Sequence, residues 1–221
     1  MDHVTDQGLI LVLGGARSGK SSFAERLAAQ LAAPRGDRVT YLATSQTLDE
    51  EMAARVARHR AARPSAWTTV ECPLAVPAAV REHAAGTGIF LLDCVTFWVT
   101  NLLFSGGALG GSRPPQEGFN YDDSLLPADE EQAASRRVQD ATDDLLRALA
   151  ETGATLIAVS NEVGLSVVPE YPLARLYRDE LGRANQRLAG AAGQVYFLVA
   201  GYALDIKVLA VDPISPKELQ P

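Results

Sequence analysis

A glycine-rich segment near the start of the chain has the composition of a phosphate-binding loop. Residues 14–21 fit the pattern G-x-x-x-x-G-K-[S/T] and lie between an apolar run and an amphipathic helical pattern, so a chance Lys-Ser in a strand-to-helix turn is the weaker interpretation. The backbone N–H groups of such a loop converge on phosphate oxygens at a helix N-terminus, while Lys20 adds a positive charge and Ser21 a hydroxyl ligand for Mg²⁺. We therefore predict a nucleotide phosphate site made of Gly14, Gly15, Ala16, Arg17, Ser18, Gly19, Lys20 and Ser21.

A second acidic side chain helps to hold the metal ion beside such a loop, commonly an aspartate that ends a neighbouring strand. Asp93 follows the apolar run 89–92 and fits this position. Asp93 could equally cap the helix that we expect to begin near Thr96, because aspartate is a favoured N-cap residue. Glu71, at the end of another short run, is a weaker alternative for the metal. The sequence thus gives Ser21 and Asp93 as candidate Mg²⁺ ligands.

A histidine among arginines lies near the end of a helix that we predict from Asp49 to Arg60. Thr47 and Glu50 have the form of a capping box at its start. Neighbouring guanidinium groups favour a neutral imidazole and could hold a triphosphate, so His59 is a candidate nucleophile toward phosphorus. The arginines that accompany it are Arg55, Arg58, Arg60 and Arg63.

A structural role for His59 is the alternative interpretation. His59 shares a helix face with Met52 and Val56, which is typical of a packed core position. Acidic residues at the start of a helix and basic residues at its end are also what the helix dipole favours on any solvated helix. From the residue pattern alone, both roles for His59 stay open.

Short apolar runs alternate with longer helical patterns along the chain. Runs that are apolar on both faces are typical of strands buried between two layers of helices. We predict a doubly wound, mainly parallel α/β sheet of the P-loop NTPase type (RecA-like), with helices on both faces. The expected strands are 9–13, 38–43, 67–70, 89–92, 155–159 and 195–199, with 206–209 as a possible seventh. The expected helices are 20–33, 49–60, 74–85, 96–104, 128–151 and 172–192.

The length and composition favour one soluble domain over residues 1–221. A Gly/Pro-rich and then acidic stretch, at about residues 105–127, is expected to be a surface excursion. The formal net charge of −7 disfavours nonspecific binding to nucleic acid or to an anionic membrane. The two cysteines support no disulfide framework, and the N-terminus has no signal-peptide pattern. We therefore expect a cytoplasmic protein with no nucleic-acid partner and no membrane insertion.

Features elsewhere in the chain indicate which class of phosphate-loop protein this is. None of the chain's four asparagines is followed by lysine, so the Asn-Lys-x-Asp motif of a GTPase switch is missing. A nucleic-acid motor would usually carry a basic surface, whereas this chain is short and acidic. Phosphoryl transfer to a small molecule is the class that the sequence favours.

Several further segments match one enzyme family in the same order along the chain. They are residues 14–21, 43–46 with 49–55, 59–60 with 63–64, 92–96 with 99–103, 160–164, and 178 with 182–188. With these segments the chain resembles the bifunctional adenosylcobinamide kinase/adenosylcobinamide-phosphate guanylyltransferase family of adenosylcobalamin synthesis. The resemblance extends from about Leu11 to about Lys207.

The resemblance implies two successive reactions on one substrate. ATP or GTP would phosphorylate the aminopropanol hydroxyl of adenosylcobinamide, and GTP would then guanylylate that phosphate through a GMP-histidine intermediate. By position, His59 matches the guanylylated histidine, and a homotrimer is the implied assembly. The nucleotide-binding segments implied in addition to the loop are Thr44, Ser45, Gln46, Arg60, Ala61, Ala62, Arg63, Glu71 and Asp93.

Three features depart from the expected family pattern. Residues 60–63 read Arg-Ala-Ala-Arg where a Lys-Asp-Gly-Arg type of loop is expected. Arg60 and Arg63 are kept as phosphate binders, whereas Ala61 and Ala62 could contact a nucleotide only through the main chain. Asp93 stands where a longer glutamate is expected, and the excursion at 105–127 is longer than expected. Two other functions stay open: a P-loop kinase for another small alcohol or nucleotide, and a regulatory subunit that senses a nucleotide without chemistry.

Overall fold

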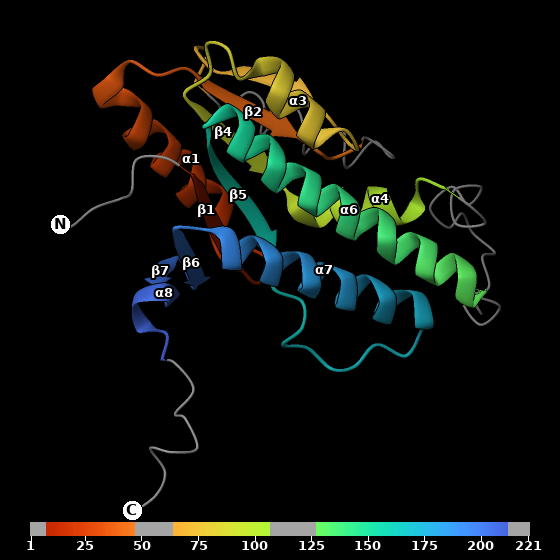
Figure 1. The fold of residues 1–221 in the computed structure, drawn as a ribbon. Helices are drawn as coiled ribbons and strands as arrows, with labels where there is room; N and C mark the ends of the chain where they lie inside the picture. Colours follow the sequence, from red (N-terminus) through yellow and green to blue (C-terminus); the bar gives the residue numbers. More distant parts are fainter. Residues whose placement is uncertain (1–7, 47–63, 107–126, 212–221) are drawn as a thin grey trace, which may run out of the picture.

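One twisted seven-stranded sheet organises the protein, with the strand order β3-β2-β4-β5-β1-β6-β7 (Figure 1). The computed structural model describes residues 8–46, 64–106 and 127–211. Neighbouring strands are parallel except for the antiparallel pair of β6 and β7 at one edge. The strands are β1 (Leu9–Gly14), β2 (Val39–Ala43), β3 (Thr68–Glu71), β4 (Ile89–Asp93), β5 (Thr155–Asn161), β6 (Gln194–Val199) and β7 (Tyr202–Asp205).

The helices cover both faces of this sheet and bury an apolar core on each. α1 (Lys20–Ala32) packs on one face against side chains such as Ile10 and Val12. The core on the other face contains Leu11 and Leu13 of β1 together with the helices α3 (Val76–His83), α4 (Val95–Phe104), α6 (Ala128–Thr152) and α7 (Pro172–Ala191). The prediction of a doubly wound, mainly parallel sheet is therefore confirmed.

The continuous apolar runs of the central strands explain the depth of the core. Every residue of β1 and β2 is buried, because neighbouring strands and helices cover both of their faces. Trp98 of α4 is the largest fully buried side chain, and its indole N–H donates a 2.9 Å hydrogen bond to the carbonyl oxygen of Leu74. The indole N–H of Trp98 therefore keeps a hydrogen-bond partner although the ring is buried.

The predicted strand at 206–209 is wrong. These residues form the short helix α8 (Ile206–Leu209), and the seventh strand is β7 immediately before it. The carboxylate of Asp205 accepts hydrogen bonds from the backbone N–H groups of Lys207 and Val208, so Asp205 caps the helix start. β7 lies at the sheet edge with half of its side chains exposed, which is why it lacks a continuous apolar run.

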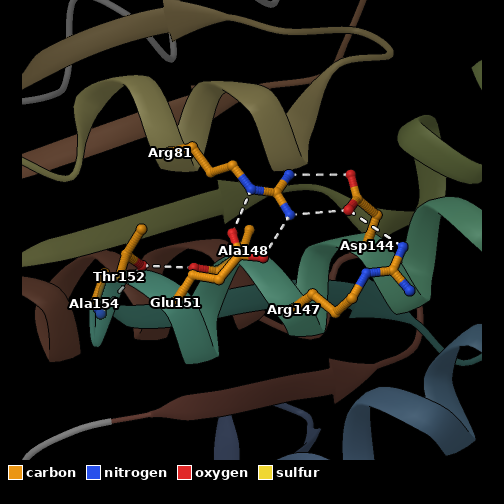
Figure 2. Close-up of polar contacts among 7 residues, drawn as sticks. All are labelled: Arg81, Asp144, Arg147, Ala148, Glu151, Thr152 and Ala154. Atoms are coloured by element: carbon orange, nitrogen blue, oxygen red, sulfur yellow. Dashed lines mark hydrogen bonds and ion pairs between the residues drawn. The ribbon is translucent and has the colours of Figure 1, made fainter.

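An ion-pair cluster joins two helices on the same side of the sheet (Figure 2). Arg81 of α3 donates to Glu151 at 2.6 Å and, with two nitrogens, to Asp144 at 2.9 and 3.1 Å. Arg147 of α6 adds a 3.3 Å contact to the same Asp144. The cluster lies near the protein surface, so we expect solvent to screen its contribution to stability.

Two predicted segments fall outside the described residues: the helix at 49–60, and residues 107–126 of the excursion. At the near end of the excursion, Arg137 of α6 donates to the carbonyl oxygens of Leu102 and Leu103, which are among the last of α4. An arginine from a neighbouring helix thus adds hydrogen bonds to carbonyls in the last turn of α4, where Ser105 also donates to Leu102. Across the described ranges, no helix is long and apolar enough to cross a membrane.

Candidate active site

The predicted phosphate loop lies between β1 and the N-terminus of α1, as the sequence pattern indicates. A Cβ atom on Gly14 would lie 2.6 Å from Ser18 Oγ and 2.7 Å from the carbonyl oxygen of Leu198, so no side chain fits there. Gly19 is the N-cap of α1 and has a left-handed backbone with φ of 92°. These two glycines let the chain turn tightly enough for its amides to surround an anion.

Lys20 and Ser18 carry the polar groups of the loop. The Lys20 ammonium donates a 2.8 Å hydrogen bond to the carbonyl oxygen of Gly15, which holds its charge across the loop. Ser18 Oγ is buried and makes no hydrogen bond within the described part of the chain. A buried hydroxyl without a partner costs free energy, and a phosphate oxygen in the loop would give it an acceptor. Ser21 is half-buried at the start of α1, while Gly15, Ala16 and Arg17 are exposed at the mouth of the loop.

The turn between β6 and β7 supports the loop, a contact that the sequence analysis missed. The backbone N–H of Gly201 donates a 3.0 Å hydrogen bond to the carbonyl oxygen of Ser18. A Cβ atom on Gly19 would lie 3.5 Å from Gly201 Cα, so the two backbones approach closely. The left-handed pair Ala200 and Gly201 forms this turn, and a Gly after a strand run was the only signal for it.

The predicted acidic residues lie at the same edge of the sheet as the loop. Ala43 of β2 is paired with Asp93 on one side and with Glu71 on the other, so the three strands end together. β5 separates the strand that carries Asp93 from β1, which leads into the loop. The carboxyl ends of parallel strands are where ligands bind in open α/β sheets, so this register brings the metal candidates toward the phosphates.

Asp93 does not cap the helix that follows it. Cys94 is the N-cap of α4, and no side chain makes a capping hydrogen bond there. Asp93 Oδ2 instead accepts a 2.9 Å hydrogen bond from the hydroxyl of Tyr41. This contact fixes one carboxylate oxygen and leaves the half-buried side chain oriented at the strand end, as expected for a group that holds a metal ion.

Thr44 has a structural role, in addition to the nucleotide contact that the resemblance implies. Its buried hydroxyl donates 2.7 Å to the carbonyl oxygen of Cys94 and accepts 2.9 Å from the N–H of the same residue. Asn101 Nδ2 donates to the carbonyl oxygens of Thr44 and Pro73, at 2.8 and 2.9 Å. These bonds tie the ends of β2 and β4 together. Contact of Thr44, Ser45 and Gln46 with a nucleotide stays a prediction.

A second polar network holds the carboxyl end of β5 beside the loop. The N–H of Asn161 donates 3.0 Å to Thr96 Oγ1, and its carbonyl oxygen accepts 3.0 Å from Asn185 Nδ2. Ser160 Oγ donates a 2.6 Å bond to Asn185 Oδ1. Asn161 is also the register partner of Gly14 at the start of the loop. α4 and α7 therefore position the strand end next to the phosphate site.

Neither cysteine is a nucleophile in this site. Burial raises the pKa of the Cys72 thiol to about 12, and burial together with the nearby Asp93 charge raises that of Cys94 to about 11. Both thiols are therefore protonated at neutral pH, whereas a reactive cysteine is a thiolate.

The histidine segment lies outside the described residues. The roles that the sequence analysis gives to this segment stay predictions; its residues are His59, Arg60, Ala61, Ala62 and Arg63. Over the ranges that the structure describes, no group of three or more His, Cys, Asp or Glu side chains could hold a metal ion. The roles of Ser21 and Asp93 as Mg²⁺ ligands stay predictions.

Comparison with known proteins shows which family this chain belongs to. The family of cobinamide kinase / cobinamide phosphate guanyltransferase (CobU) matches residues 10–206 of this chain. The chain belongs to this family. Members of the family are bifunctional enzymes, and the resemblance seen in the sequence motifs is thereby confirmed.

Curated relatives match nearly the whole chain. The bifunctional adenosylcobalamin biosynthesis protein CobU of Salmonella typhimurium is 43% identical over 90% of this chain and 99% of its own length. CobU of Escherichia coli is 42% identical with the same coverage. CobP of Pseudomonas aeruginosa, with the same description, is 41% identical over 89% of this chain and 96% of its own.

Among solved structures, the flagellar accessory protein FlaH of Methanocaldococcus jannaschii is similar to this chain with a TM-score of 0.45 and 15% sequence identity. The match covers 89% of this chain and 74% of the FlaH chain.

Proposed function

We propose that this protein phosphorylates adenosylcobinamide with ATP or GTP and then transfers GMP from GTP to the new phosphate, yielding adenosylcobinamide-GDP for adenosylcobalamin assembly. The observation that carries this proposal is a preformed phosphate loop, with Lys20 held across it and Ser18 Oγ without a partner, in a chain of the cobinamide kinase family. The first step uses the loop, and the second uses His59.

In the first step, the hydroxyl oxygen of adenosylcobinamide attacks the γ-phosphorus, and the bond from this phosphorus to the β–γ bridging oxygen breaks. The nucleoside diphosphate leaves, and the hydroxyl proton passes to solvent. Lys20 and the loop amides stabilise the charge on the transferred phosphoryl group. Since catalysis of such transfers rests on positioning and electrostatics, the hydrogen bond from Gly201 to the loop supports it indirectly.

The donor set at the strand edge fits a magnesium nucleotide. Ser21 offers a hydroxyl and Asp93 a carboxylate, which are the hard oxygen ligands that Mg²⁺ prefers. Tyr41 orients the carboxylate of Asp93 through its 2.9 Å hydrogen bond. When bound, Mg²⁺ neutralises charge that develops between the β- and γ-phosphates.

In the second step, an imidazole nitrogen of His59 attacks the α-phosphorus of GTP, and pyrophosphate leaves. A phosphate oxygen of adenosylcobinamide phosphate then attacks the same phosphorus, and the phosphorus–nitrogen bond to His59 breaks. Arg60 and Arg63 offset the negative charge of the triphosphate. Ser45, Gln46 and Glu71 contact the nucleotide in this proposal, together with main-chain groups of Thr44, Ala61 and Ala62.

In this proposal both reactions take place in the cytoplasm, as the cysteine usage favours, and in a homotrimer, as the family resemblance implies. The experiment that tests the function uses two labels in parallel. With γ-labelled ATP, the label should move to adenosylcobinamide. With α-labelled GTP and Mg²⁺, the protein should retain a label that acid removes and base does not. A kinase for another alcohol would give neither product, and a nucleotide-sensing subunit would bind nucleotide without transferring any label.

A further inference from the structure

The segment between β5 and α7 presents apolar side chains to solvent beside the phosphate loop. We call residues 162–171 the β5–α7 segment; it leaves the carboxyl end of β5 and runs along α7 to the start of that helix (Figure 1). Its first N–H, that of Glu162, donates a 3.1 Å hydrogen bond to the carbonyl oxygen of Gly14. Leu165, Val167 and Val168 are 82%, 90% and 65% exposed. Three large aliphatic side chains within four positions thus lie uncovered next to the site.

Hydrogen bonds within the β5–α7 segment hold it in this conformation. The N–H of Gly164 donates 2.7 Å to the carboxylate of Glu162, and Ser166 Oγ donates 2.9 Å to the carbonyl oxygen of Val163. At the other end, Arg175 Nη1 donates to the carbonyl oxygens of Pro169 and Glu170, at 3.1 and 2.5 Å. Polar groups of the segment and Arg175 thus hold its backbone, while Leu165, Val167 and Val168 stay exposed.

Position and chemistry together select the occupant of this surface. A contiguous exposed apolar surface on a soluble protein usually marks a site for a ligand or a partner. A fully extended chain gains at most about 3.5 Å per residue, so Leu165, three residues beyond Glu162, lies within about 10 Å of it, and Glu162 is hydrogen-bonded to Gly14. A ligand that covers Leu165 therefore lies near the phosphate loop, and Val167 and Val168 extend the apolar surface away from it. The acceptor alcohol has to reach the transferred phosphoryl group, and it is carried on a corrinoid, a broad macrocycle with large apolar faces.

We propose that the β5–α7 segment is the docking surface for the corrin ring of adenosylcobinamide, with Leu165, Val167 and Val168 in contact with the ring. This inference rests on the proposed function and adds the location of its second substrate. Docked there, the ring lies beside Gly14, and the arm that ends in the aminopropanol hydroxyl extends toward the nucleotide phosphates. The negative nucleotide and the apolar ring are thus bound by different groups, the loop amides and the aliphatic side chains.

The test compares two sets of substitutions of exposed aliphatic residues. The test variant is Leu165→Ser with Val167→Ser and Val168→Ser. The control variant is Val208→Ser with Leu209→Ser and Val211→Ser, whose side chains are 79%, 64% and 90% exposed. These lie on or just after α8, away from the β5–α7 segment in Figure 1. Circular dichroism and thermal melts establish that both variants are folded, and the single variant Val167→Ser gives a milder case.

The measurement is the dissociation constant of cobinamide, obtained by equilibrium dialysis with the visible absorbance of the corrinoid as the signal. A nonhydrolysable ATP analogue and Mg²⁺ are present throughout. The triple variant should bind cobinamide roughly 10- to 100-fold more weakly, because it loses three apolar contacts, and Val167→Ser should lie between it and the native protein. The control variant should bind within about twofold of the native protein.

Labelling by α-labelled GTP in the absence of corrinoid separates this inference from the proposed function. The triple variant should retain the protein-bound label, since that reaction needs no corrinoid. An unchanged dissociation constant in the triple variant overturns the docking surface and leaves the proposed function intact. The same result with a lower mass by light scattering also overturns it, and makes the segment a contact between copies of the chain. A native protein that binds no cobinamide contradicts both.

Discussion

The N–H of Gly201 donates a 3.0 Å hydrogen bond to the carbonyl oxygen of Ser18, so the turn after β6 is tied directly to the phosphate loop. Two consecutive residues with positive φ, Ala200 at 51° and Gly201 at 87°, form this turn. The loop is therefore braced from the strand next to β1, on the side away from Asp93. A loop with fixed amides loses less freedom when it binds a triphosphate.

Gly201→Ala should weaken this brace. The substitution places a side chain in the left-handed region and should cost about 1–2 kcal/mol of folding free energy. We expect a severalfold higher KM for the nucleotide in the kinase assay, since the loop is held less firmly. Ala200→Gly is the matched control, because glycine adopts positive φ freely, and it should leave KM and the melting temperature close to native. If Gly201→Ala matches the native protein in both measurements, the brace has no role in binding.

Thr44→Val separates the structural role of Thr44 from a role in nucleotide binding. The variant leaves the N–H and the carbonyl oxygen of Cys94 without the Thr44 hydroxyl, so urea unfolding should show a loss of about 2–3 kcal/mol. Thr142→Val is an equally buried control, whose hydroxyl donates only within its own helix and should cost less than about 1 kcal/mol. A native unfolding free energy with a raised nucleotide KM would instead mean that the hydroxyl acts mainly on the ligand.

The sequence predicts the parts of this site that depend on local chemistry. The loop at 14–21 is recognised because its spacing and flanking elements are both local, and the structure places Lys20 and Ser18 as a phosphate site requires. The long buried strands can also be predicted from the sequence, since β1 and β2 are buried on both faces and mainly apolar. The expectation that Asp93 and Glu71 each end a strand is confirmed, and both are register partners of Ala43 in β2, which lies between their strands.

Contacts between distant parts of the chain could not be predicted in this way. The bond from Gly201 to Ser18 and the pair of Asn161 and Asn185 join residues far apart in sequence, and the motifs that contain Ser18, Asn161 and Asn185 do not specify these contacts. The error at 206–209 has a local cause, because Ile206, Val208 and Leu209 read as a strand while Asp205 caps a helix there. A capping residue outweighed apolar composition in that short segment.

Asp93→Asn tests the metal assignment. An amide is a weaker ligand than a carboxylate, so the Mg²⁺ concentration for half-maximal kinase activity should rise roughly 10- to 100-fold. Tyr41→Phe removes the 2.9 Å hydrogen bond but keeps the carboxylate, and it should produce a smaller shift in the same direction. The Mg²⁺ titration of each variant supplies the comparison. An Asp93→Asn titration that overlays the native curve would leave Asp93 without a part in holding the metal.

Arg81 should make the protein's stability depend on acid pH. Hydrogen bonds from Arg81 are the main cause that lowers the pKa of Asp144 and of Glu151 below their usual 3.8 and 4.5. A carboxyl with a lowered folded pKa contributes stability above its unfolded pKa and loses it as pH falls through the folded value. At pH values above about 5, Arg81→Gln should therefore have a slightly lower melting temperature than the native protein. Below about pH 4, this difference in melting temperature should shrink.

Arg147→Gln is the control for this cluster, because Arg147 contacts only Asp144 within it and is more exposed than Arg81. Its effect on the melting temperature should be smaller at every pH. Melts of the three proteins across the acid range provide the comparison. A constant difference between Arg81→Gln and the native protein from neutral pH down to about pH 3 would exclude titration of these carboxylates as its cause.

In the proposed function, two activities depend on separate groups, the phosphate loop for phosphorylation and His59 for guanylylation. A pair of assays on His59→Ala, with a melt of the same variant, tests this separation. We expect that protein labelling from α-labelled GTP vanishes while phosphorylation of adenosylcobinamide persists, because Lys20, Ser21 and Asp93 still position the nucleotide. Retained labelling, or loss of both activities together with a lowered melting temperature, would contradict it and make His59 a structural residue.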